Sequence, residues 1–201
     1  MFLYPCATQN VLVSRVGRIL VPCVNTAEDV KLAVAASKYP VGGPGSVGGT
    51  RSIFVNLRPQ LPGGFGELFD YVQERANKET IVMVQIETAD ALANVDAICA
   101  VPGLDVAFIG PGDLACSMGL VQEVRMPGCW SHPKFNAAVS AVAAACKKYG
   151  VVAGFWNSDV PGKAKQGFGL LVVDDDIAAM HGALHKSLAE KQKLRAEIGK
   201  D

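Results

Sequence analysis

The sequence predicts an α/β fold with a parallel β-sheet, and two patterns support this prediction. Short apolar segments of strand length alternate along the chain with longer segments of helical periodicity, which is the order of repeated β-α units. The strand segments are nearly continuous in apolar residues, as expected for a sheet that is covered on both faces. With 201 residues, half of them hydrophobic, we expect one domain over residues 1–201.

Six segments have the length and composition of strands. The first two, Asn10–Val16 and Arg18–Pro22, are short and rich in β-branched residues. The other four are Thr80–Ile86, Leu104–Gly110, Val151–Trp156 and Phe168–Asp174.

Helical segments separate most of these strands. The first, Asn25–Tyr39, has Thr26 as its predicted N-cap, acidic residues in its first turn and one apolar face. In the segment "SDVPGKAKQ" we expect Pro161 to interrupt the helix. The remaining predicted helices are Phe65–Lys78, "ADALANVDAICAV", "PGDLACSMG", His132–Gly150 and the tail Asp175–Lys200.

The glycine-rich segment Pro40–Gly49 allows two interpretations, a phosphate-binding loop or plain turns. It lacks both the GK[ST] ending and a G-x-G-x-x-G motif opening a helix, which favours turns. The absence of a nucleotide-binding motif also favours a (β/α) barrel over an open doubly wound sheet, the two architectures that the pattern allows. Six strands are two fewer than a closed TIM-type barrel contains, so the predicted barrel is incomplete.

The composition argues against several classes of function. Lys and Arg together number 19, as do Asp and Glu, and this balance disfavours a surface for nucleic acid or anionic membranes. No apolar run approaches the roughly 18 residues of a transmembrane helix, and the first ten residues lack the features of a secretory signal. The six cysteines form no CxxC pair, and there are only three histidines. We therefore expect a cytoplasmic protein with reduced thiols and no zinc cluster.

Polar residues follow several predicted strands at the end where α/β active sites lie. Arg15 is near the end of the first strand, and Asp174 ends the last. Gln85 and Glu87 alternate along one strand end, so both side chains point to the same side, and Asp113 follows the next strand along the chain. Two carboxylates beside an amide suit a hard divalent ion, Mg²⁺ or Mn²⁺. The alternative is that Glu87 forms a salt bridge and Asp113 only caps the helix after it.

The turn Gly110-Pro111-Gly112 brings backbone N–H groups to the start of a helix, where they can bind an anion such as a carboxylate. A metal beside such a pocket could hold a 2-oxo acid, with the carboxylate on the N–H groups and the keto oxygen on the metal. The metal would then act as a Lewis acid when a C–C bond breaks or forms.

The motifs "VQIET…DVAFIGPGDLACSMG", together with "LVPCVNTAEDV", "HPKF" and "GFGLLVVDDD", resemble the metal-dependent class II pyruvate aldolases of the HpcH/HpaI aldolase/citrate lyase family. The resemblance implies an eight-stranded TIM barrel in homo-oligomers whose last helices pack on a neighbouring subunit. It also implies reversible cleavage of 4-hydroxy-2-oxo acids to pyruvate and an aldehyde, with Mg²⁺, Mn²⁺ or Co²⁺ as cofactor.

The resemblance assigns roles residue by residue. Glu87 and Asp113 would be the metal ligands, and Gln85 would contact the bound oxo acid. The N–H groups of Gly112 and Asp113 would hold the carboxylate of the oxo acid. Arg15 would bind the pyruvyl oxygen and support the enolate.

The resemblance begins at about Val11, so we expect a chain that lacks the family's first two strands and the acid/base histidine on the second. The three histidines present, His132, His181 and His185, lie in later segments. Our leading hypothesis is a metal-dependent aldolase, and the alternative is a catalytically impaired relative that binds metal and oxo acid or serves as a partner subunit. A lyase acting on an acyl-CoA thioester ranks below both, because the loops show no basic cluster for the CoA phosphates.

Overall fold

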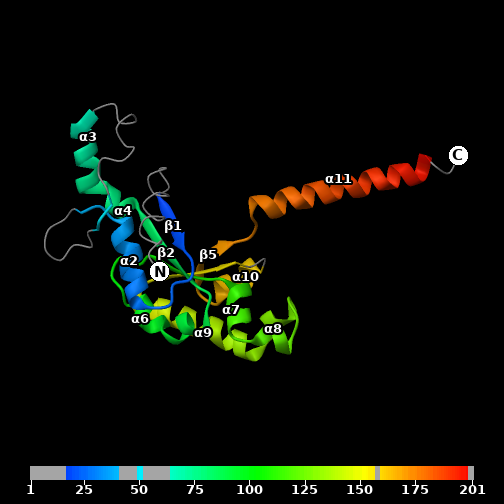
Figure 1. The fold of residues 1–201 in the computed structure, drawn as a ribbon, viewed down its shortest axis with the longest axis horizontal. Coiled ribbons are helices and arrows are strands. Elements are labelled where there is room, and N and C mark those ends of the chain that lie inside the picture. The colour runs from blue at the N-terminus through cyan, green and yellow to red at the C-terminus, as the bar shows by residue number, and fades with distance from the viewer. Residues whose placement is uncertain (1–16, 41–48, 52–63, 157–158, 199–201) are drawn as a thin grey trace.

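In the part of the chain that the structure describes, the strands form one parallel sheet of five. The computed structural model describes residues 17–40, 49–51, 64–156 and 159–198, and Figure 1 shows their arrangement. The strands are hydrogen-bonded in the order of the sequence, β1-β2-β3-β4-β5. They are β1 Arg18–Val21, β2 Ile81–Ile86, β3 Val106–Ile109, β4 Val152–Trp156 and β5 Phe168–Val172.

This strand order decides between the two predicted architectures. Every pair is parallel, and each successive strand adds to the same edge of the sheet. A doubly wound sheet reverses direction at a switch point, whereas a (β/α) barrel winds one way. The α/β prediction is therefore confirmed, with barrel-type winding. Five of the six predicted strands are present, and the sixth, Asn10–Val16, lies outside the described residues.

The two faces of the sheet differ in burial. Residues of alternate parity, such as Val82, Val84 and Ile86 on β2, are fully buried, because helices cover this face. On the other face the side chains of Leu20, Val152 and Trp156 are 37%, 43% and 43% exposed. The core of the described residues thus lies between one sheet face and its helices, and apolar side chains on the other face are partly exposed.

Helix α2, Ala27–Ser37, begins as predicted at Thr26. The Thr26 hydroxyl accepts a hydrogen bond from the Asp29 N–H at 3.2 Å, and the Asp29 carboxylate accepts one from the Thr26 N–H at 2.9 Å. This capping box satisfies two backbone donors that the first turn leaves unpaired. Val30, Ala33 and Val34 then form the buried face of the helix.

The remaining helices follow the predicted segments, with differences in detail. The segment predicted at 65–78 contains α3, a π-helical turn and α4, and "ADALANVDAICAV" forms two short helices that meet at Asn94. Pro161 does not interrupt α10, because proline in a first turn lacks only an N–H that would be unpaired anyway. The bounds are α3 Gly64–Tyr71, η2 Val72–Ala76, α4 Asn77–Glu79, α5 Ala89–Ala93, α6 Val95–Cys99, α7 Pro111–Ser117, α8 Leu120–Glu123, η3 Gly128–Ser131, α9 Pro133–Tyr149, α10 Val160–Lys165 and α11 Asp176–Ile198.

Helix α11 has a different setting from the other helices. It runs away from the sheet and its covering helices (Figure 1), and its large apolar side chains are exposed. No helix among the described residues combines the length and apolarity needed to cross a membrane.

Candidate active site

The candidate site forms where β2 and β3 end side by side. Gln85 is paired in register with Phe108, and Ile86 with Ile109, so the residues that follow the two strands meet at one edge of the sheet. The Gly110 N–H donates to the Ile86 carbonyl at 3.2 Å and extends this ladder by one residue. Glu87 and the turn that opens α7 are therefore neighbours, as the sequence predicted.

A cavity of about 550 Å³ opens at this edge. Gln85, Gly112 and Asp113 line it, and so do Trp130 and Lys163. A cavity of this volume suits a small organic ligand. The structure thus brings together three of the residues that the sequence singled out.

Gly110 allows the two strand ends to approach each other. A Cβ atom on this residue would lie 2.5 Å from Gln85 Nε2 and 2.9 Å from Glu87 Oε2, and both distances are short enough to be steric clashes. Because glycine has no Cβ, the amide of Gln85 and the carboxylate of Glu87 both reach this point beside the cavity.

Glu87 is a buried carboxylate with little exposure, 5%. Its Oε1 accepts a hydrogen bond of 2.6 Å from the Cys23 N–H, and Cys23 has a positive φ of 53°. Glu87 forms no ion pair with any described residue, so the predicted salt-bridge alternative has no support in this part of the chain. A buried carboxylate needs neutralisation, and one N–H donor supplies only part of it.

Asp113 lies in the first turn of α7 and its side chain is exposed. The N-cap position of this helix is occupied by Gly110, and no side chain forms a capping hydrogen bond there. The alternative in which Asp113 only caps the helix is therefore wrong. The N–H groups of the first turn have no acceptor within the helix itself. Asp113 and these N–H groups therefore remain available to a ligand in the cavity.

Lys163 is a cavity residue that the sequence analysis missed. It is buried, its Nζ donates to Gln166 Oε1 at 3.0 Å, and Nζ lies 4.5 Å from the centre of the Phe155 ring. Burial lowers the pKa of Lys163, and the nearby Asp159 carboxylate opposes that shift. Nothing local distinguishes it from Lys165 on the same helix, which is exposed.

Several predicted features do not meet at this cavity. Arg15 and most of the glycine-rich segment lie outside the described residues. Within the described ranges no group of three or more His, Cys, Asp or Glu side chains is placed to hold a metal, and none of the three histidines lines the cavity. A metal held by Glu87 and Asp113 would therefore need further oxygen ligands that do not come from His, Cys, Asp or Glu side chains of the described residues.

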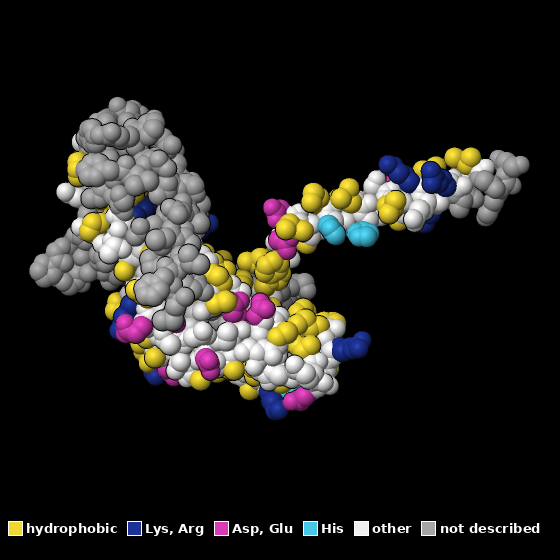
Figure 2. Space-filling model, viewed as in Figure 1, with side chains coloured by type: hydrophobic (Ala, Val, Ile, Leu, Met, Phe, Trp, Pro, Cys, Tyr) yellow, Lys and Arg dark blue, Asp and Glu magenta, His cyan; other side chains and the backbone are white. Residues whose placement is uncertain are grey.

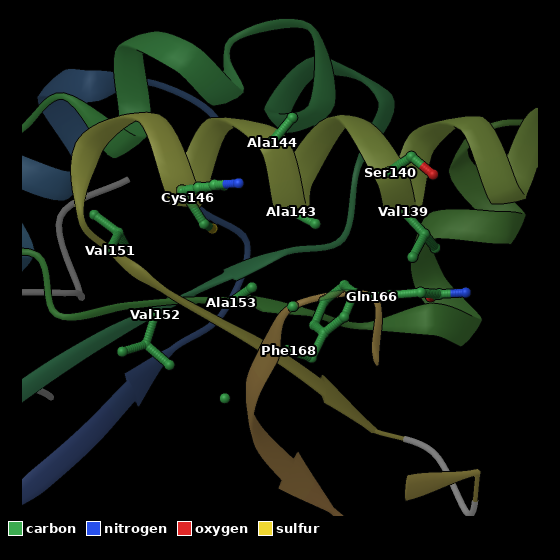
Figure 3. A pocket seen from close by; sticks show the side chains of 13 residues that line it. Val139, Ser140, Ala143, Ala144, Cys146, Val151, Val152, Ala153, Gln166 and Phe168 are labelled. Carbon is green, nitrogen blue, oxygen red and sulfur yellow. The ribbon is translucent and has the colours of Figure 1, made fainter. Parts of the chain in front are cut away.

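A second cavity, of about 560 Å³, lies between α9 and the amino-terminal residues of β4 and β5. Figure 3 shows Val139, Ala143 and Cys146 of α9 pointing toward the strands across this space. Active sites of parallel α/β proteins form at the carboxyl ends of the strands, and this cavity is at the opposite end. Its lining is mainly apolar, so we do not assign it chemistry.

Comparison with known proteins places the site in context. The sequence model of the HpcH/HpaI aldolase/citrate lyase family matches residues 5–163. A hydroxypyruvate/pyruvate aldolase of Sagittula stellata is 36% identical over 175 residues, which cover 86% of this chain and 63% of that protein. A 5-keto-4-deoxy-D-glucarate aldolase of Klebsiella pneumoniae is 33% identical over 170 residues, which cover 83% of this chain and 60% of the relative. The chain therefore spans about three fifths of the length of these relatives.

Solved structures agree with the sequence comparisons. The HpcH/HpaI aldolase of Desulfitobacterium hafniense matches with a TM-score of 0.74 and 27% identity, over 94% of this chain and 68% of that one. Macrophomate synthase matches with a TM-score of 0.78 over 96% of this chain and 64% of its own, and at 24% identity it supports the fold alone.

Proposed function

Because the chain belongs to the HpcH/HpaI aldolase/citrate lyase family, we propose that it is a metal-dependent carbon–carbon lyase that cleaves 4-hydroxy-2-oxo acids to pyruvate and an aldehyde. Two relatives bear the names of aldolases that support this reaction class. The observation that carries the proposal is the meeting of Gln85, Glu87 and the Gly110–Asp113 turn at adjacent strand ends.

The residues present fit a hard divalent ion, Mg²⁺, Mn²⁺ or Co²⁺. Glu87 is buried with one N–H donor on Oε1, and its Oε2 lies close to Gly110, which lines the cavity. Asp113 adds a second carboxylate at the cavity wall. When bound, the ion supplies Lewis acidity to the keto group of the substrate.

The protein's own groups bind and orient the substrate in this proposal. The N–H groups of Gly112 and Asp113 receive the carboxylate of the oxo acid, since the first turn of a helix presents unpaired donors. The Gln85 amide contacts the oxo acid from the neighbouring strand. Arg15 binds the pyruvyl oxygen and stabilises negative charge that develops there, a role assigned to it by the family resemblance.

A second candidate function rests on the absence of histidine from the described lining of the cavity. General acid–base groups contribute about 10²–10⁴-fold to typical enzyme rates. Without such a group the chain would be a catalytically impaired relative that binds metal and oxo acid or serves as a partner subunit. In either case we propose a cytoplasmic homo-oligomer, with neither nucleic acid nor membranes as partners.

A pyruvate-release assay tests the proposal. The purified chain is offered a panel of 4-hydroxy-2-oxo acids with Mg²⁺, Mn²⁺ or EDTA, and Glu87→Gln is compared with Asp90→Asn, an exposed acid in the first turn of α5. We expect metal-dependent release that is lost in Glu87→Gln and kept in Asp90→Asn. A folded chain that binds Mn²⁺ through Glu87 but releases no pyruvate would instead support the binding relative. Mn²⁺ binding unaffected by Glu87→Gln would contradict the metal site itself.

A further inference from the structure

Helix α11 carries two histidines one turn apart. His181 and His185 occupy positions i and i+4, which lie on the same side of a helix. Their ring centres are 5.8 Å apart, with the ring planes at 62°, and both side chains are exposed. Figure 2 shows histidine side chains (cyan) on this projecting helix, beside exposed apolar residues (yellow). The geometry therefore presents two imidazoles side by side to solvent.

Both imidazoles are available as ligands. Among the described residues, neither His181 nor His185 has a hydrogen-bond or ion-pair partner; their recorded contact is with each other. His132 provides a contrast, because its Nδ1 accepts from the Lys134 N–H at 3.2 Å and its Nε2 lies 3.2 Å from Glu123 Oε2. A neutral imidazole with an unengaged nitrogen is a common metal ligand.

The surroundings of the pair select the kind of metal. A hollow of about 150 Å³ beside it is lined by the two histidines, Leu184 and Leu188. The positions three and four residues before His181 and after His185 carry no carboxylate; they are Ile177, Ala178, Leu188 and Ala189. Imidazole suits Zn²⁺, Ni²⁺ and Cu²⁺, whereas Mg²⁺ and Mn²⁺ prefer oxygen ligands. The donor set is thus the opposite of the one at Glu87 and Asp113.

The spacing is compatible with a shared ion. Metal–nitrogen bonds to imidazole are roughly 2.0–2.1 Å, and an ion shared by two rings therefore holds the ring centres about 4.5–5.2 Å apart, so the two exposed rings, 5.8 Å apart, approach each other slightly on binding. We propose that His181 and His185 form a two-histidine site for Zn²⁺, Ni²⁺ or Cu²⁺ on α11, with water completing the coordination. Binding joins two successive turns, so the ion stabilises the helical form of α11 by mass action. This proposal does not depend on aldolase activity.

The test uses the untagged full chain and Ni²⁺ as the probe. Ni²⁺ is titrated by calorimetry in the presence of excess Mg²⁺, which occupies the carboxylate site. The histidine ring signals are followed by NMR, because Ni²⁺ broadens the signals of nearby nuclei. We expect saturation near one equivalent, selective broadening of two of the three histidines, and slower hydrogen exchange in α11.

Matched variants decide the outcome. His181→Gln and His185→Gln should each weaken Ni²⁺ binding at least tenfold, since glutamine keeps the helix but removes the imidazole. His132→Asn should bind Ni²⁺ as the unsubstituted chain does, because asparagine can still cap α9. Unchanged binding in both α11 variants would overturn the proposal and point to thiols. Displacement of Ni²⁺ by Mg²⁺ would overturn it equally and assign the ion to the carboxylates.

Discussion

At the scale of single residues, Gly110 determines how closely the two halves of the candidate site can approach. The two atoms nearest to its missing Cβ are the ends of the Gln85 and Glu87 side chains, which can rotate away, and the third is the Glu87 Cβ at 3.0 Å, which requires only a small shift. An added methyl group should therefore displace the two proposed site residues more than it unfolds the protein. This separates an effect on the site from an effect on stability.

We predict that Gly110→Ala lowers Mn²⁺ affinity at least tenfold while the unfolding free energy falls by no more than about 1–3 kcal/mol, the usual cost of overpacking. Calorimetric Mn²⁺ titration and urea denaturation measure the two quantities. Gly66→Ala is the control, because a Cβ there meets nothing within 4 Å. Unchanged Mn²⁺ affinity in Gly110→Ala would show that Glu87 does not ligate from its present position.

Residue-level prediction succeeded where the signal is local and failed where it is not. Thr26 is predicted as a cap from its residue type and its place before the helix, and the structure pairs it with Asp29, only three residues away. The hydrogen bond from the Cys23 N–H to Glu87 joins residues that are distant in sequence, and the burial of Lys163 depends on packing. No local sequence pattern therefore predicts either of them.

At the scale of elements, Lys38 connects the end of α2 by hydrogen bonds to the segment that leads into β2. It is buried, and its Nζ donates to the carbonyls of Asn77 and Thr80 at 2.7 and 2.6 Å. The Asn77 side chain also bonds to the backbone of Tyr39, the residue after this lysine. Without the ammonium group, the part-buried Asn77 carbonyl and the buried Thr80 carbonyl would both lose this donor.

We predict that Lys38→Met lowers the unfolding free energy by about 2–3 kcal/mol, since a buried carbonyl that loses its hydrogen-bond donor costs about 1–3 kcal/mol. Lys31→Met on the same helix is the control; its side chain is 57% exposed, and we expect a change within about 0.5 kcal/mol. Denaturant midpoints compare the two variants. Equal stability of the Lys38 variant and the parent would mean that the ammonium contributes nothing to the junction.

The same lysine gives a prediction of pH dependence. Burial lowers the pKa of Lys38 from 10.5, and the Asp105 carboxylate partly opposes this shift. The folded state therefore releases this proton at lower pH than the unfolded chain does, so this group makes the unfolding free energy rise with pH up to about 10.5. We expect that rise to be missing in Lys38→Met when stability is measured between pH 8 and about 10.5.

At the scale of the whole molecule, one side of α11 presents a long exposed apolar surface. Its large apolar side chains recur every three or four residues over much of the helix and are between 54% and 72% exposed; they are Ile177, Met180, Leu184, Leu188, Leu194 and Ile198. An apolar stripe of this length on a projecting helix is typical of a surface that packs against another chain, and at about 100° per residue His181 and His185 fall beside the stripe rather than within it. It supports the proposal that the protein is a homo-oligomer.

We predict that Leu188→Lys shifts the protein to a smaller species in light scattering coupled to size-exclusion chromatography, because a charge at a packed apolar contact is costly. Ala189→Lys adds the same charge one residue along, outside the stripe, and should leave the mass unchanged. A parent chain that runs as a monomer at all concentrations would contradict the oligomer.

The sequence by itself determined the kind and order of the elements and which polar residues lie at the strand ends. Strand composition, helical periodicity and capping depend on neighbouring residues, and Gln85, Glu87 and Asp113 stand out because they are polar residues at or just after the ends of apolar strands. Only the tertiary structure decided that the strands wind one way, that the Gln85 amide and the Glu87 carboxylate both lie against Gly110, and that Lys163 is buried while Lys165 is exposed. These features depend on which distant segments pack together, and packing is a property of the folded chain rather than of any local window.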